Sequence, residues 1–227
     1  MSLSHERVLF ITGASSGIGA ATARAAVAEG WRVVLGARSL DKLEALAAEL
    51  GEDRAYAVSC DVTEEGSQQR MVDRAIKRFG QIDAVFANAG HGASEPGIEA
   101  GDYENWRSMV LTNVLGVAVT AKVTMTELKK RKGHFILTGS RAGRVTLSGS
   151  LYGATKWAVR GYARNLREAV KGTGVRITEI APGAVDTPFF DDPKPDALRE
   201  EDIARAVMYA LNQPPGVDLG VIEISPI

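Results

Sequence analysis

Short apolar runs alternate along the chain with longer segments of helical periodicity. The runs are continuously apolar rather than alternating, as in the VLFIT of residues 8–12, which is typical of strands buried on both faces. They predict seven strands, at residues 7–12, 32–37, 55–60, 82–87, 134–138, 175–181 and 220–225. The segments between them predict helices at 18–29, 41–50, 64–79, 103–131, 151–170 and 201–212. Strict alternation of strand and helix favours an α/β fold: a doubly wound, seven-stranded parallel sheet flanked by helices, in a single domain spanning 1–227.

The charge balance excludes some classes of partner. Among 227 residues, 27 basic and 28 acidic side chains give a net charge of -1, so no broad basic surface for nucleic acid or an anionic membrane is expected. No basic-then-apolar leader begins the chain, and polar residues interrupt the apolar segment 109–125. We therefore expect a cytoplasmic protein without nucleic-acid or membrane partners.

Cysteine and histidine usage makes disulfide and metal chemistry unexpected. The single cysteine, Cys60, ends an apolar run and is predicted to be a buried thiol. His5 and His134 lie far apart with no ligand-like spacing, and no metal is predicted. His91 follows a predicted strand end and is a candidate for contact with a substrate, although a solvated loop histidine is the alternative.

A glycine-rich loop joins the first strand to the first helix. In Thr12-Gly-Ala-Ser-Ser-Gly-Ile-Gly19, Gly13 permits a tight turn, Gly17 allows close backbone approach and Gly19 allows close packing of helix on sheet. The free amides and positive dipole end of the helix attract a pyrophosphate. The loop, including Ser15, Ser16 and Ile18, therefore predicts a dinucleotide site, the alternative being a purely structural turn.

The residues after the second strand indicate the cofactor. An acid at this place would bind a ribose 2′-hydroxyl, but the chain has Arg38 and Ser39 there. A guanidinium pairs with a 2′-phosphate, so NADP is preferred over NAD, unless Arg38 is simply a solvated charge.

Tyr152 and Lys156 lie one helical turn apart at the start of the predicted sixth helix. At this spacing the two side chains share one helix face. A cation about 4 Å from a phenolate gives a gross attraction of roughly 4 kcal/mol at an effective dielectric of about 20. Lys156 is therefore predicted to lower the pKa of Tyr152, by up to about 3 units before desolvation opposes it.

Two further polar residues fall near this pair in the predicted topology. Ser140 ends the fifth strand, at the sheet edge where α/β folds bind ligands, and Asn113 interrupts an apolar helix. Taken singly, each residue has a structural reading: Tyr152 with Lys156 as an interfacial aromatic and a snorkelling lysine, Ser140 as a turn residue, and Asn113 as a satisfied buried amide.

With these pieces placed, the chain resembles the short-chain dehydrogenase/reductase family over nearly its whole length. The matching motifs are the glycine loop Thr12–Gly19, Asp61-Val62, Asn88-Ala89-Gly90, the set Asn113, Ser140, Tyr152 and Lys156, Pro182-Gly183, and Thr187. The resemblance implies a Rossmann-type fold and a cofactor site that includes these segments. It also implies that Asn113 places a relay water, that Lys156 binds ribose, that Thr187 touches the nicotinamide carboxamide, and that the long helices build a homodimer or homotetramer.

Three departures from the family pattern are visible. Ala87 stands where the family commonly has a first asparagine, the substrate loop at about 187–201 is short, and the C-terminal segment lacks the usual glycine-rich piece. The first leaves the backbone role of the Asn-Ala-Gly turn unchanged.

These observations predict an NADP(H)-dependent oxidoreductase that interconverts a carbonyl and a secondary alcohol. Tyr152 is the expected acid/base, Ser140 and Tyr152 hold the substrate oxygen, and His91 is a further substrate contact. A non-catalytic NADPH sensor is the alternative, although it would favour a broken catalytic set. An epimerase or dehydratase would require further acid/base groups and a larger substrate region.

Overall fold

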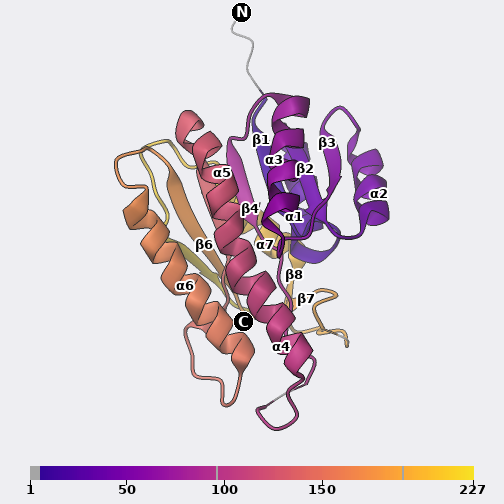
Figure 1. Cartoon of the computed structure of the whole chain (residues 1–227), viewed down its shortest axis with the longest axis vertical. Coiled ribbons are helices and arrows are strands. Elements are labelled where there is room, and N and C mark those ends of the chain that lie inside the picture. Colours follow the sequence, from indigo (N-terminus) through magenta and orange to yellow (C-terminus); the bar gives the residue numbers. More distant parts are fainter. Residues whose placement is uncertain (1–5, 96, 191) are drawn as a thin grey trace, which may run out of the picture.

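The structure is a computed structural model that describes residues 6–95, 97–190 and 192–227 (Figure 1). Within these residues, seven parallel strands form one sheet in the order β3-β2-β1-β4-β5-β6-β9. The strands are β1 (Val8–Thr12), β2 (Arg32–Ala37), β3 (Ala55–Ser59), β4 (Ala84–Ala87), β5 (His134–Thr138), β6 (Arg176–Pro182) and β9 (Val221–Ile224). The strand order reverses between β1 and β4, so the predicted doubly wound parallel sheet is confirmed, with its switch point at these two strands.

Helices cover both faces of the sheet. Helices α1 (Gly17–Ala28), α2 (Leu40–Leu50) and α7 (Glu200–Leu211) share one core with the sheet. Helices α3 (Glu65–Phe79), α5 (Val117–Arg131) and α6 (Leu151–Ala169) share the other.

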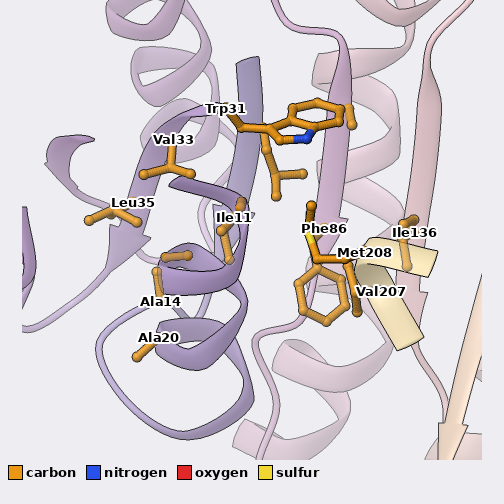
Figure 2. Packing of buried hydrophobic residues seen from close by; sticks show 14 of the residues in the cluster. Ile11, Ala14, Ala20, Trp31, Val33, Leu35, Phe86, Ile136, Val207 and Met208 are labelled. Carbon is orange, nitrogen blue, oxygen red and sulfur yellow. The ribbon is translucent and has the colours of Figure 1, made fainter. Parts of the chain in front are cut away.

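Neighbouring residues of one strand enter different cores, which explains the continuous apolar runs. Ile11 of β1 packs in the first core, together with Phe86 and Val207 (Figure 2), whereas Phe10 packs in the second. Both are fully buried, so burial on both faces favours apolar side chains at successive positions of such a strand.

The predicted helix at 103–131 contains a segment of different geometry. The stretch from 103 to 131 consists of α4 (Tyr103–Val110), a π-helical segment η1 (Leu111–Gly116) and α5. A π-helical segment is a local widening of an α-helix and often coincides with a functional site. Asn113 lies within this one. Among the described residues, Tyr103–Arg131 is also the one helix long and apolar enough to cross a membrane; 44% of its most apolar window is buried inside the protein.

A two-stranded sheet closes the segment that follows β6. Strand β7 (Val185–Asp186) pairs with β8 (Leu198–Arg199), and α7 begins directly afterwards. Of the substrate loop expected at about 187–201, the described residues 187–190 and 192–197 lie between these strands, and its last residues belong to β8 and α7. The short strand pair was not predicted, because two-residue strands leave no periodic pattern.

Candidate functional site

The carboxyl ends of β1, β4 and β5 are held together by side-chain hydrogen bonds. The Thr12 Oγ1 atom accepts from the backbone N–H groups of Asn88 and Ala89 at 3.1 and 3.2 Å. The Asn88 side chain donates to the carbonyl oxygen of Gly13 at 3.2 Å and accepts from Thr138 Oγ1 at 3.1 Å. The Asn88-Ala89-Gly90 turn thus fixes the glycine loop against the sheet edge.

Two positions of the glycine loop, Gly13 and Gly19, have no room for a side chain. Gly13 has a φ of 67°, and a Cβ there would lie 2.8 Å from Ala89 Cα. A Cβ on Gly19 would lie 2.2 Å from the carbonyl oxygen of Gly13. No other residue type fits either position without movement of the backbone.

The start of α1 fits an anionic group. Its N-cap residue, Ser16, makes no side-chain capping bond, and the first turn contains no acidic residue. The first-turn amides and the helix dipole are therefore available to a phosphate. Thr187 lies beside this loop, with its side chain 3.4 Å from the Cβ position of Gly17.

The adenine side of the predicted cofactor site is formed by the ends of β2 and β3. Arg38 is exposed, and within the described part of the chain it makes no ion pair. The Asp61 carboxylate accepts from the N–H and the hydroxyl of Thr63 at 2.9 and 2.7 Å. Partial burial alone would raise its pKa, but the Thr63 hydrogen bonds and the Arg38 charge hold the pKa of Asp61 below its ordinary value.

Three further residues lie at the ends of β2 and β3: Ser39, Cys60 and Val62. Ser39 is the N-cap of α2, and Val62 is buried beside η1, where it touches the Cβ position of Gly116. The buried thiol predicted for Cys60 is confirmed; burial raises its pKa to about 11, which makes it a poor nucleophile.

Asn113 is buried and holds the loop that follows β4. Its side-chain oxygen accepts from the N–H of His91 at 3.0 Å, and its amide donates to the His91 carbonyl at 2.9 Å. The same amide donates to Thr155 Oγ1 at 3.2 Å, and Thr155 in turn donates to the carbonyl oxygen of Tyr152 at 2.8 Å. The side chain thus connects η1, the β4–α4 loop and the first turn of α6.

The ring of His91 has partners at both nitrogens. Nε2 lies 3.1 Å from Ser108 Oγ and Nδ1 lies 3.1 Å from the carbonyl oxygen of Gly92. His134 is buried, and burial lowers its pKa to about 3, so it stays neutral. Within the described residues no group of three His, Cys, Asp or Glu side chains is placed to hold a metal ion.

Helix α6 brings Tyr152 and Lys156 to the edge of β5. Ser150 caps the helix by accepting from the Gly153 N–H at 3.0 Å, which sets Tyr152 in the first turn. The Lys156 Nζ donates to the Thr138 carbonyl at 2.9 Å and lies 5.8 Å from the centroid of the Tyr152 ring. The predicted shared face is present, and the Lys156 ammonium lies beside the last residue of β5.

Ser140 lies beside the Tyr152 hydroxyl. Its Oγ accepts from the Ala142 N–H at 3.0 Å and so caps the short 3₁₀ helix η2 (Arg141–Gly143). A hydroxyl that accepts here still has its own O–H to donate.

Burial controls the titration of this group. It raises the pKa of Tyr152, with the Ser140 hydroxyl acting in the opposite direction, and it lowers the pKa of Lys156 to about 8, with the Glu179 carboxylate acting in the opposite direction. The predicted lowering of the Tyr152 pKa is therefore wrong for this structure. Desolvation of the buried phenol outweighs the opposing effect of the Ser140 hydroxyl, and Lys156 is not among the causes of the shift.

Sequence reasoning missed two neighbours of this group. Phe189 stacks 5.5 Å from the Tyr152 ring and touches the Cβ position of Gly92 at 2.9 Å. Glu179, a buried carboxylate in β6, pairs with Arg144 directly behind the Ser140 turn. A glutamate inside the apolar run Ile177–Pro182 was the available signal.

Pro182 and Gly183 end β6 at the same edge of the sheet. The Gly183 N–H donates to the Ile224 carbonyl at 2.7 Å, and the turn leads into β7 and Thr187. The carboxyl edge thus brings the predicted cofactor segments and the Ser140–Tyr152–Lys156 group together on one side of the sheet.

A family model, a sequence relative and two solved structures all match this chain over most of its length. Residues 7–197 match the family model described as short chain dehydrogenase. A protein of Staphylococcus aureus (strain MRSA252) described as an uncharacterized oxidoreductase is 37% identical over all of both chains. The alcohol dehydrogenase from the archaeon Thermococcus sibiricus, solved with 5-hydroxy-NADP, has a TM-score of 0.90 at 34% identity, covering 98% of this chain and 97% of its own. Serine dehydrogenase from Escherichia coli has a TM-score of 0.89 at 31% identity, covering 96% and 97%. The chain therefore belongs to the short-chain dehydrogenase family and is an oxidoreductase.

Proposed function

We propose that the protein is an NADP(H)-dependent oxidoreductase that interconverts a carbonyl and a secondary alcohol. The observation that supports this most strongly is the convergence of Ser140, Tyr152 and Lys156 at the carboxyl edge of β5, the edge that also holds the glycine loop. A nicotinamide cofactor held on that loop supplies or accepts the hydride. The remaining task, moving one proton at the substrate oxygen, belongs to the chain.

Tyr152 is the proposed proton donor in the direction of reduction. Its raised pKa keeps the hydroxyl protonated at neutral pH, which suits an acid. As the carbonyl carbon gains the hydride, the carbonyl oxygen takes the Tyr152 proton, and the products are the alcohol and a phenolate. In the reverse direction the phenolate removes the alcohol proton.

Lys156 and Ser140 stabilise the charges that this transfer creates. The Lys156 ammonium, one turn along the same helix face, attracts the phenolate, and its pKa of about 8 lets it carry charge at neutral pH. The Ser140 O–H, which lies beside the Tyr152 hydroxyl, would turn to donate to the substrate oxygen as negative charge develops there. The same ammonium is the proposed ligand of the cofactor ribose.

Asn113 has a supporting role in this proposal. Because its side chain is fully engaged by His91 and Thr155, a relay water would be held by its backbone carbonyl rather than by its amide. His91 has both ring nitrogens engaged, so the proposed substrate contact would use its ring edge.

The cofactor preference is proposed from Arg38. An exposed guanidinium with Ser39 beside it, and no acid at the end of β2, favours a 2′-phosphate. The proposed site comprises Gly13, Ser15, Ser16, Gly17, Ile18, Gly19, Arg38, Ser39, Asp61, Val62, Asn88, Ala89, Gly90, Tyr152, Lys156, Pro182, Gly183 and Thr187. The NADP analogue in the Thermococcus sibiricus enzyme supports this preference.

Assembly and location are part of the proposal. Large apolar side chains are exposed along η1 and α6, including Leu115 at 46% and Trp157 at 47%, which suits an interface between copies of the chain in a homodimer or homotetramer. We place this assembly in the cytoplasm, acting on a small molecule, with the segment at about 187–201 as the substrate loop of a single domain.

The test is a cofactor-resolved activity screen. The purified protein is incubated with NADPH, and separately with NADH, and a panel of small aldehydes, ketones and keto acids, while nicotinamide absorbance is followed; the alcohols are tested with the oxidised cofactors. Turnover that strongly prefers NADPH is the expected result. Turnover with NADH alone contradicts the cofactor assignment, and tight NADPH binding without turnover of any compound favours a sensor.

A further inference from the structure

A carboxylate lies buried in β6, the strand next to the edge strand β9. Glu179 belongs to β6, is 3% exposed, and points to the same face as Ile177, the face covered by α6. The neighbouring strand makes room for it, since a Cβ on Gly139 would lie 2.1 Å from Glu179 Oε1. Burying a charge is costly unless it is paired, so such a residue requires an explanation.

Arg144 forms a bidentate ion pair with the Glu179 carboxylate. Its NH1 and NH2 atoms donate to the two oxygens of Glu179 at 2.8 and 2.9 Å. Its Nε donates to Glu223 on the edge strand β9, and NH1 also lies 3.5 Å from the Ser140 carbonyl oxygen. The Arg144 side chain is 12% exposed, so the pair is largely desolvated.

The pair lies directly behind the Ser140 turn. Arg144 ends the η2 turn that Ser140 begins, and a Cβ on Gly143 of this turn would lie 2.6 Å from the Lys156 carbonyl oxygen. Anchoring Arg144 therefore presses the serine turn onto the part of α6 that carries Lys156.

Glu179 also acts on Lys156 by charge. It is the one carboxylate, among the described residues, whose charge favours the charged form of Lys156. The other groups that face the ammonium are Tyr152 on α6 and the Thr138 carbonyl of β5; the charged group behind Glu179 is Arg144.

We propose that Glu179 and Arg144 are positioning residues for the proposed reaction, holding the Ser140 turn against α6 and placing a carboxylate behind the Lys156 ammonium. The proposal rests on the proposed function. Stability alone does not explain the pair, because replacing a buried ion pair with apolar side chains of similar volume is often neutral or stabilising.

The experiment compares two double variants with the wild-type protein. R144M/E179L replaces the buried pair with apolar side chains. R167M/D218N removes another arginine–carboxylate ion pair, Arg167 with Asp218, at the opposite end of α6. Three quantities are measured: thermal unfolding, kcat for the best carbonyl substrate as a function of pH, and the pKa of Lys156 from the ¹⁵Nζ resonance of lysine-labelled protein, assigned with K156Q.

The expected result is a folded R144M/E179L variant whose kcat falls about 10-fold or more, because small misplacements of catalytic groups cost this much. The Lys156 pKa is expected to move below its wild-type value, and the alkaline limb of the pH profile to move to lower pH with it. R167M/D218N is expected to match the wild type in kcat and in the Lys156 pKa.

Several outcomes overturn the proposal. An unchanged kcat or an unchanged Lys156 pKa in R144M/E179L overturns it. Failure of this variant to fold also overturns it, since the ion pair would then be structural. The single variant E179Q, which keeps the volume of the side chain, checks the last case: a folded E179Q protein with wild-type kcat and Lys156 pKa also overturns the proposal. If the wild type turns over no substrate, the proposed function fails, while the Lys156 pKa still tests the placement of the carboxylate.

Discussion

The two halves of the candidate site are built in different ways. The loop between β1 and α1 is shaped by the absence of side chains, since Cβ atoms at Gly13 and Gly19 would meet backbone atoms at 2.8 and 2.2 Å. The edge of β5 and β6 is shaped by buried polar side chains, with Asn113, Ser140 and Lys156 only 1%, 8% and 6% exposed. The first half should therefore respond to added volume, and the second to changes in protonation and hydrogen bonding.

The largest expected effect is loss of the proton donor. Tyr152→Phe keeps the ring against Phe189 but removes the hydroxyl, so kcat should fall by on the order of 10² or more while NADPH affinity stays close to that of the wild type. Stopped-flow turnover and fluorescence titration with NADPH measure the two quantities. Turnover comparable to the wild type would remove Tyr152 from the mechanism.

Adding one methyl group to the glycine loop should lower the affinity for NADPH, whereas Tyr152→Phe lowers kcat and leaves that affinity unchanged. In Gly19→Ala the new Cβ would lie 2.2 Å from the Gly13 carbonyl, so α1 has to shift and NADPH affinity should fall by about 100-fold, or about 3 kcal/mol. Isothermal titration calorimetry measures this loss.

Gly161→Ala is the matched control on α6. Apart from the backbone of its own helix and its chain neighbours, no atom lies within 4 Å of its Cβ position, so cofactor affinity should not change. Helix propensity should stabilise the fold by up to about 1 kcal/mol. Equal NADPH affinities for the two alanine variants would show that the tight glycine loop does not receive the cofactor.

The charge at the end of β2 should control cofactor choice. Arg38→Asp removes a phosphate partner and adds repulsion, which should shift preference towards NAD by about 2 kcal/mol, or roughly 30-fold in the ratio of kcat/KM values. Measuring kcat/KM with NADPH and NADH for both proteins gives the ratio. If it does not move, Arg38 does not contact the 2′-phosphate.

The pH dependence of the wild type tests the same polar half without any substitution. Lys156, with its pKa lowered to about 8, is charged below that pH and neutral above it. The rate of carbonyl reduction should therefore stay level below about pH 8 and fall by up to about tenfold for each further unit as the ammonium is lost. A kcat profile between about pH 6 and about pH 10 checks this; a profile that rises through this range would contradict the assigned direction of proton transfer.

Local pattern alone was enough to predict most of the architecture. Continuous apolar runs identified the strands of the sheet, since burial on both faces favours apolar side chains at successive positions, as at Phe10 and Ile11. The glycine loop and the spacing of Tyr152 and Lys156 are likewise local features, and the structure places both at the carboxyl edge.

Tertiary structure decided what depends on contacts between distant residues. The ion pair of Arg144 with Glu179 joins residues 35 positions apart, and that of Arg144 with Glu223 joins residues 79 apart, distances at which no periodic signal exists. The π segment around Asn113 and the pairing of β7 with β8 also depend on such contacts. The sign of the Tyr152 pKa shift shows the reason: the spacing of Tyr152 and Lys156 follows from the sequence, but how far each is desolvated depends on everything packed around them.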